Sequence, residues 1–207
     1  MPPTPGLAIL VHVLLGRWRA APRSRAAAEP IARRANREDE VSGRLWQGRY
    51  RCQALLDERA ILAALAYVDL NPIRAGIADG LEHSHHTSVR QRIAAVTEQP
   101  ARIDQPLQPV AGLPLLSMPC TLGDYLQLVE WTGRQQRGDK RGAIARDMPN
   151  ALRHLGLPPE RWQLAVRGIG SGWWRAVGGA SDLLQLARDL GQCWLKGTGF
   201  ARRAGLA

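Results

Sequence analysis

Residues 43–78 read GRLWQGRYRCQALLDERAILAALAYVDLNPIRAGIA, and the second half of this stretch decides the local fold. Apolar residues recur at helical spacing over 58–70, which predicts an amphipathic helix. Asp57 stands directly before it, and aspartate is a residue type that caps helix N-termini. On the side of the helix that faces a core, we expect three buried residues: Leu62, Leu65 and Val68.

The end of this helix is marked by Asn71 and Pro72. Proline restricts the residue before it, so the pair predicts an end or a kink, with a short further turn closed by Gly76. Tyr67 and Asn71 lie four residues apart and therefore share one helix face. We expect the Tyr67 hydroxyl to be accessible there, although a tyrosine on an apolar helix is most often a core residue.

The chain has 207 residues, a net charge of +10 and a sequence pI near 10.8. Residues 1–56 hold ten arginines against four acids, a net charge of +6. Such basicity indicates nucleic acid or an anionic membrane surface as a partner. Nearly all the basic residues are arginine, which suits phosphate recognition but is also what a GC-rich genome produces.

Three cysteines, Cys52, Cys120 and Cys193, are widely spaced and form no pair typical of zinc or disulfides. They predict free thiols in a reducing cytosol. No apolar run approaches the length of a membrane span. We therefore expect a cytoplasmic protein with no membrane partner.

Four regions are predicted from the changes in composition. Residues 1–28 are expected to be a divergent, poorly ordered N-terminus, and 29–95 to be a structured unit that carries the tyrosine helix. Residues 96–120 are rich in proline and predict a linker. Residues 121–207 predict a small helical C-terminal domain, with helices near 122–132 and 181–195; in the second, Trp194 falls on the apolar side.

A basic and aromatic cluster precedes the tyrosine helix. It consists of Arg44, Trp46, Arg49, Tyr50 and Arg51. Aromatic rings that stack on unpaired bases, together with arginines that contact phosphates, are typical of proteins that bind single-stranded nucleic acid. The alternative interpretation is that Trp46 and Tyr50 are ordinary packing residues.

The pattern of a tyrosine, three residues and Asn-Pro, preceded by this cluster, resembles the REP-associated tyrosine transposases, bacterial enzymes of the single-tyrosine HUH class. EPIARRANRED before the helix, HTSVRQRI after it, and DYLQLVEWTGR with DKRGAI further on resemble a long-form subgroup. The resemblance covers roughly residues 29–195. It implies DNA transposition and recombination by a mobile element, with single-stranded or hairpin DNA as the partner.

The resemblance also implies a role for each matching residue. Tyr67 matches the nucleophile, whose hydroxyl attacks a DNA phosphodiester to form a 5′-phosphotyrosine and release a 3′-OH. Such a hydroxyl is a weak nucleophile, and a divalent metal, Mg²⁺ or Mn²⁺, activates the phosphate. Asn71 matches a third metal ligand, since its amide oxygen suits a hard ion. Arg74, on the next turn, matches a phosphate contact.

The other half of a HUH site is a strand with two histidines that flank a hydrophobic residue. His12 matches the second of these histidines, but Leu10 occupies the position of the first. His83, His85 and His86 have comparable spacing, but they follow the tyrosine helix in a polar segment. An N-terminal truncation or frameshift is expected to account for the difference.

The expected fold is therefore mostly α: the remnant of an α+β HUH domain that has lost most of its sheet, followed by the helical C-terminal domain. DNA cleavage by this chain alone is expected to be impaired. Two alternatives are a non-catalytic DNA-binding remnant or regulator, including one of the helix-turn-helix type, and a decayed gene product without a role.

Overall fold

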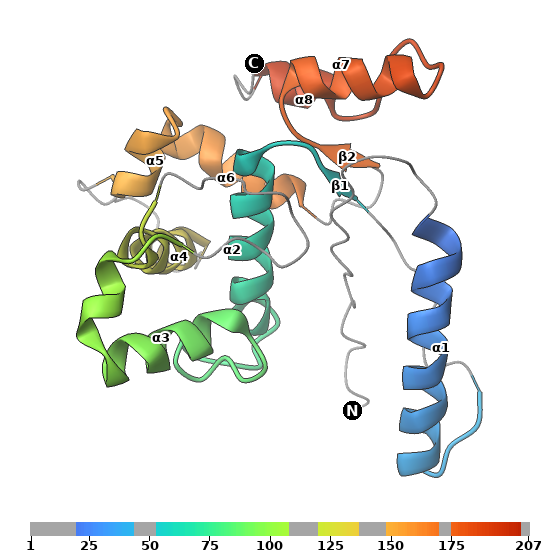
Figure 1. Ribbon diagram of the computed structural model, residues 1–207, viewed down its shortest axis with the longest axis vertical. Coiled ribbons are helices and arrows are strands. Elements are labelled where there is room, and N and C mark those ends of the chain that lie inside the picture. The colour runs from blue at the N-terminus through green and yellow to red at the C-terminus, as the bar shows by residue number, and fades with distance from the viewer. Residues whose placement is uncertain (1–19, 44–52, 108–119, 137–147, 170–174, 204–207) are drawn as a thin grey trace.

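The computed structural model describes residues 20–43, 53–107, 120–136, 148–169 and 175–203. As the sequence predicts, this part of the chain is mostly helical (Figure 1). The elements in chain order are α1 (Ala20–Glu38), β1 (Ala54–Leu55), α2 (Glu58–Arg74), α3 (Ser88–Glu98), the 3₁₀ helix η1 (Pro100–Asp104), α4 (Leu122–Gln136), α5 (Asn150–His154), α6 (Pro159–Gly168), β2 (Ala176–Val177), α7 (Ala180–Asp189) and α8 (Thr198–Arg203).

Helix α2 is the central element, and it packs against α4 and α6. Its N-terminus forms as predicted: Asp57 Oδ1 accepts a hydrogen bond of 2.6 Å from the backbone N–H of Ala60. Helix α4 also begins as its sequence predicts, because Thr121 and Asp124 exchange hydrogen bonds through their side chains and backbone N–H groups. Trp162 of α6 then donates to Thr132 of α4 at 2.8 Å, so α4 and α6 are joined inside the core.

The C-terminal end of α2 differs from the prediction. The helix continues through Asn71 and Pro72 to Arg74. The proline lacks the N–H that would bond back to the preceding turn, but its carbonyl still accepts from Ile77 at 2.9 Å. Gly76 follows with φ of +69°, the left-handed conformation expected of a glycine that ends a helix.

The two strands form a parallel pair in which Ala54 is opposite Ala176 and Leu55 opposite Val177. They bring together segments that lie far apart in the sequence, on either side of the predicted proline-rich linker. Asp57 strengthens this junction, since its Oδ2 accepts from the backbone N–H of Gly179 at 2.7 Å. One hydrophobic core therefore contains residues from both predicted units.

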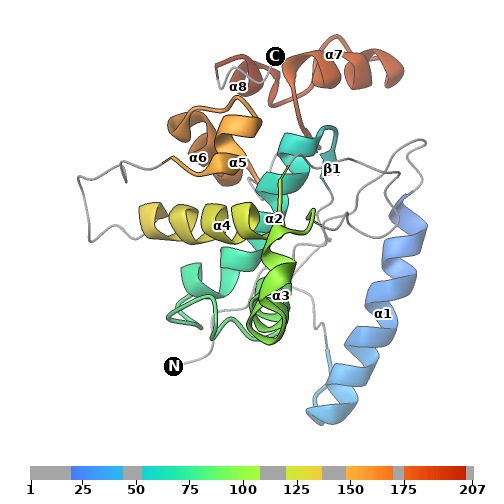
Figure 2. The ribbon, with the colours of Figure 1, turned by 60° about the vertical axis from the view of Figure 1, so that its left-hand side comes forward.

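Helix α1 stands beside the other helices (Figures 1 and 2). It begins at Ala20, well before the boundary predicted near residue 29, and Pro30 lies inside it. The alanines of residues 20–28 favour a helix, which explains the difference. Arg33 and Arg34 pair with Glu29 and Glu38 one turn away on the exposed surface.

Two burial expectations fail. Val68 is 40% exposed instead of buried, whereas Leu62 is buried as predicted and Leu65 partly so. Trp194 does not lie on a helix: α7 ends at Asp189, and the indole is 65% exposed in the segment that follows. No helix in the described part of the chain is long and apolar enough to cross a membrane.

Candidate nucleic-acid interface

The last turns of α2 bring together three of the residues predicted to act on DNA. The Arg74 guanidinium carbon lies 4.6 Å from the centroid of the Tyr67 ring, which is the distance of a cation–π contact. Asn71 lies between them, one turn from each, and is exposed. The three side chains therefore share one face, and the arginine and asparagine are open to solvent on it.

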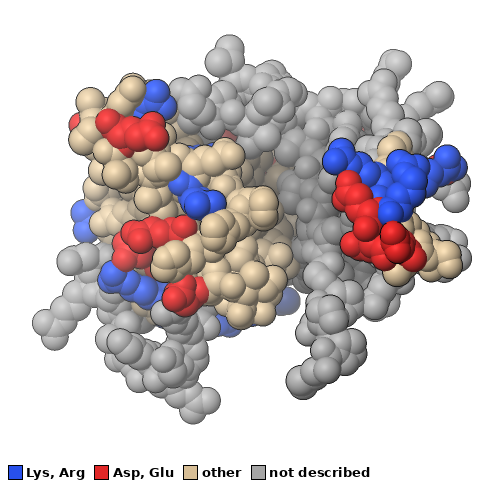
Figure 3. Space-filling model, turned by 90° about the horizontal axis from the view of Figure 1, so that it is seen from below, with Lys and Arg blue, Asp and Glu red and all other residues tan. Residues whose placement is uncertain are grey.

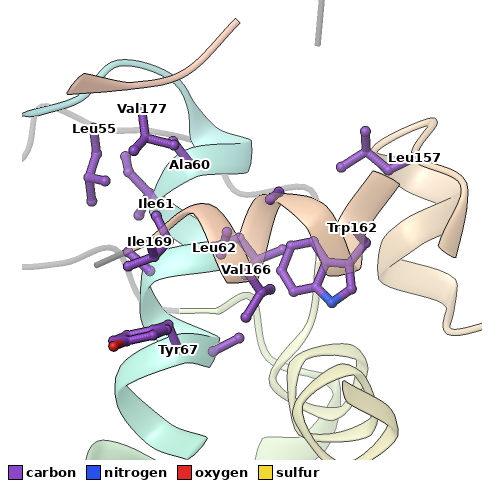
Figure 4. Close-up of a cluster of buried hydrophobic side chains, with 14 of the residues drawn as sticks. Leu55, Ala60, Ile61, Leu62, Tyr67, Leu157, Trp162, Val166, Ile169 and Val177 are labelled. Carbon is purple, nitrogen blue, oxygen red and sulfur yellow. The ribbon is translucent and has the colours of Figure 1, made fainter. Parts of the chain in front are cut away.

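Tyr67 itself belongs to the core. The residue is 8% exposed, and its ring joins the cluster that contains Leu62, Trp162 and Val166 (Figure 4). Figure 4 shows the hydroxyl at the edge of the labelled cluster, directed away from Trp162. It makes no hydrogen bond to a described residue. The ring is thus fixed by packing, and its polar end lies at the rim.

The basic and aromatic cluster of Arg44, Trp46, Arg49, Tyr50 and Arg51 lies outside the described residues. Its position relative to Tyr67 is therefore not described. Its role in DNA binding remains a prediction from the sequence.

The described residues do not fit a divalent metal site at this face. Within the described ranges, no three His, Cys, Asp or Glu side chains come together in a group that could hold a metal ion. His83 Nδ1 lies 2.6 Å from Asp79, and His85 Nδ1 lies 2.7 Å from the Arg90 guanidinium. Asn71 alone offers one amide oxygen, which is too few ligands to hold Mg²⁺ in place.

The sequence analysis missed a buried carboxylate on the opposite side of α2 from this face. Asp69 of α2 is fully buried. Its carboxylate accepts from Tyr125 Oη at 2.5 Å, from Ser88 Oγ at 2.8 Å and from the Val89 N–H at 3.2 Å, and Arg92 Nη1 lies 3.3 Å away. The network joins α2, α3 and α4. The sequence signal that could have indicated this network is an acidic residue placed between the apolar residues Val68 and Leu70.

Tyr125 donates the shortest of these hydrogen bonds to Asp69. Burial, followed by the nearby Asp69 charge and the hydrogen bond to Asp69, raises the pKa of the Tyr125 hydroxyl well above its usual value. The hydroxyl therefore stays protonated at neutral pH. The Arg92 guanidinium also lies 4.9 Å from the centroid of the same ring, so Asp69 and Tyr125 together hold Arg92 in one position.

On the face that Figure 3 shows, the charged side chains of the described residues form small groups. Figure 3 shows basic and acidic side chains side by side over α1, with smaller groups elsewhere on that face. The described surface in this view therefore carries no broad patch of a single sign.

No family model matches this sequence, and no curated protein or solved structure matches it either. The resemblance to tyrosine transposases thus depends on the residues quoted for it.

Proposed function

We propose that this chain binds single-stranded or hairpin DNA and that it derives from a tyrosine transposase whose cleavage activity is impaired. The observation that carries the proposal is the net charge of +10. Nearly all of the basic residues are arginines, and only two are lysines. Arginine forms paired hydrogen bonds with phosphate, and each phosphate contact releases counterions from DNA. The motif that ends in Asn71 and Pro72 supports the assignment to transposases.

In this proposal the exposed end of α2 is a DNA-binding face. Arg74 is available to a phosphate from its position over the Tyr67 ring, and the Asn71 amide is available to a base or a phosphate. The cluster at residues 44–51 supplies further phosphate contacts and stacking. The protein acts in the cytoplasm, on or near the nucleoid.

The ancestral reaction would use Tyr67 as nucleophile and Mg²⁺ or Mn²⁺ as cofactor. In that step the tyrosine oxygen bonds to phosphorus, the bond to the 3′ oxygen breaks, and that oxygen takes the proton. We propose that this chain alone does not carry it out at a useful rate, because the described residues offer the metal only Asn71.

The experiment is a titration of a labelled hairpin oligonucleotide with the full chain, followed by fluorescence anisotropy. The test variant replaces Arg44, Arg49 and Arg51 by glutamine. The matched control removes the same charge from α1 by replacing Arg33, Arg34 and Arg37. We expect the test variant to lose affinity by about a hundredfold, since each charged hydrogen bond contributes about 1.5–3 kcal/mol in a protein and less where it is exposed.

The control is expected to lose much less, because two of its arginines already pair with glutamates. Equal losses in the two variants would contradict a localised site. Preference for duplex over hairpin DNA would instead favour a regulator of the helix-turn-helix type.

A further inference from the structure

A pocket of about 270 Å³ lies between α3, η1 and the start of α4. Two arginines line it, Arg92 from α3 and Arg102 from η1, together with the polar side chains of Ser88, Gln91 and Gln105. No acidic residue lines it among the described residues. We call it the α3–η1 pocket, and it is separate from the Tyr67 face.

Both arginines are held by contacts that leave donors for a ligand. Arg92 uses only Nη1, toward Asp69 at 3.3 Å and Ser88 at 2.8 Å. Arg102 uses only Nε, toward Gln99 at 2.7 Å. Among the described residues, the other guanidinium nitrogens have no acceptor. A guanidinium is a planar fork that matches two oxygens of one phosphate.

The opposite wall of the pocket is fixed by backbone contacts. Leu107 N donates to the carbonyl of Cys120 at 3.0 Å, and Leu122 N donates to that of Gln105 at 2.9 Å. Gly123 lets η1 approach closely, since a Cβ there would stand 2.7 Å from Ile103 Cγ1. Of the two arginines, Arg92 is positioned before any ligand arrives, because Asp69, Ser88 and the Tyr125 ring hold it, and this lowers the entropic cost of binding.

We propose that the α3–η1 pocket binds a phosphoryl group. The donors available to a ligand are the unused guanidinium nitrogens of the two arginines and the amides of Gln91 and Gln105, because the single proton of the Ser88 hydroxyl already goes to Asp69. Asp69 is fully buried, and its carboxylate already accepts hydrogen bonds from Tyr125, Ser88 and Val89. The volume lies just below the range of about 300–1,000 Å³ for drug-sized ligands, and so suits a phosphate with its sugar. The phosphate could belong to a DNA backbone or to a free nucleotide or phosphate ion. The proposal does not rest on the DNA-binding function above.

The test uses the full chain and two pairs of matched variants. Ala95→Glu places a carboxylate in the pocket, whereas Ala94→Glu places the same charge on the preceding residue of α3, which is exposed and does not line the pocket. Arg102→Gln removes an exposed pocket arginine, and Arg90→Gln removes an arginine of α3 that pairs with His85 outside the pocket. Circular dichroism checks that each variant keeps its helices.

Binding of inorganic phosphate and of a mononucleotide is measured by isothermal titration calorimetry, and binding of a short single-stranded oligonucleotide by anisotropy. We expect Ala95→Glu and Arg102→Gln to weaken binding by about tenfold or more, the usual effect of losing one charged hydrogen bond, and the two controls to change it far less. If Ala95→Glu fails to fold, Arg102→Gln decides, because Arg102 is exposed.

The two arms distinguish the sources of phosphate. If the pocket variants weaken the binding of phosphate or the mononucleotide but not of the oligonucleotide, the ligand is a small phosphate compound. If they weaken the binding of the oligonucleotide, the ligand is a DNA backbone. If test and control variants behave alike in both arms, or no probe binds, the proposal is wrong. A chain that binds phosphate but no oligonucleotide would contradict only the DNA-binding function.

Discussion

Replacing Tyr125 by phenylalanine tests the buried network that joins α2, α3 and α4 around Asp69. The change removes one oxygen from a side chain that is fully buried, and with it a hydrogen bond of 2.5 Å to the Asp69 carboxylate. A hydrogen bond to a charged group contributes about 1.5–3 kcal/mol. We expect Tyr125→Phe to lower the free energy of unfolding by about 2 kcal/mol.

The assay is urea unfolding of the full chain, followed by tryptophan fluorescence, with thermal unfolding as a second measurement. For a chain of this length, about 2 kcal/mol corresponds to a fall in Tm of about 4–8 °C. Tyr67→Phe is the matched control, because its hydroxyl makes no hydrogen bond to a described residue. We expect the control to change stability by less than about 0.5 kcal/mol. A loss below that value for Tyr125→Phe, or equal losses for both variants, would refute the reasoning.

Three further predictions concern other parts of the chain. Gly178→Ala should destabilise the protein by about 1–3 kcal/mol in the same unfolding assay, because the added Cβ would stand 2.7 Å from the side chain of Leu56. Gly80→Ala should leave the stability unchanged, because a Cβ at position 80 would meet no atom within 4 Å. Burial, and then nearby acidic charges, raises the pKa of Cys120 to about 11. Iodoacetamide at pH 8 should therefore label the exposed Cys193 well before the buried Cys120. Peptide mapping that finds the reverse order would contradict the burial of Cys120. Incubation with a hairpin oligonucleotide and Mg²⁺ or Mn²⁺ should give no covalent protein–DNA adduct on a denaturing gel; an adduct that is lost in Tyr67→Phe would show that the chain cleaves DNA.

The local features of the fold could be predicted from the sequence, because they depend on neighbouring residues. Asp57 caps α2 and Gly76 follows its end, as their residue types and positions indicate. The helical content follows from the apolar spacing in the same way. Of the two outcomes predicted at Pro72, the end of the helix is not found, since a proline near the end of a helix costs little when the following turn supplies other hydrogen bonds.

Contacts between distant segments could not be predicted. Nothing near Asp57 indicates that its second oxygen binds the N–H of Gly179, or that Ala54 pairs with Ala176. The same holds for Asp69, whose partner Tyr125 lies on another helix. Such pairs depend on how whole elements pack, which a local pattern does not contain. Val68 was misplaced for a related reason, because helical spacing does not say which faces of α2 the other helices cover.

The candidate site could be predicted in part. Tyr67, Asn71 and Arg74 do share one face, as their spacing requires, and the cation–π contact between the first and the last confirms that geometry. Whether that face binds DNA is a proposal that geometry alone does not test. The α3–η1 pocket had no sequence signature, since its two arginines come from different elements.

The salt dependence of DNA binding tests the central claim most directly. A labelled single-stranded or hairpin oligonucleotide is titrated with the full chain between about 50 and 200 mM salt, and the logarithm of the binding constant is plotted against that of the salt concentration. Each neutralised phosphate contributes a slope of about −0.7 on single strands, so three contacts predict a slope near −2 or steeper. Absence of binding at the lowest salt, or an affinity that salt does not change, would contradict the claim that this arginine-rich chain binds DNA.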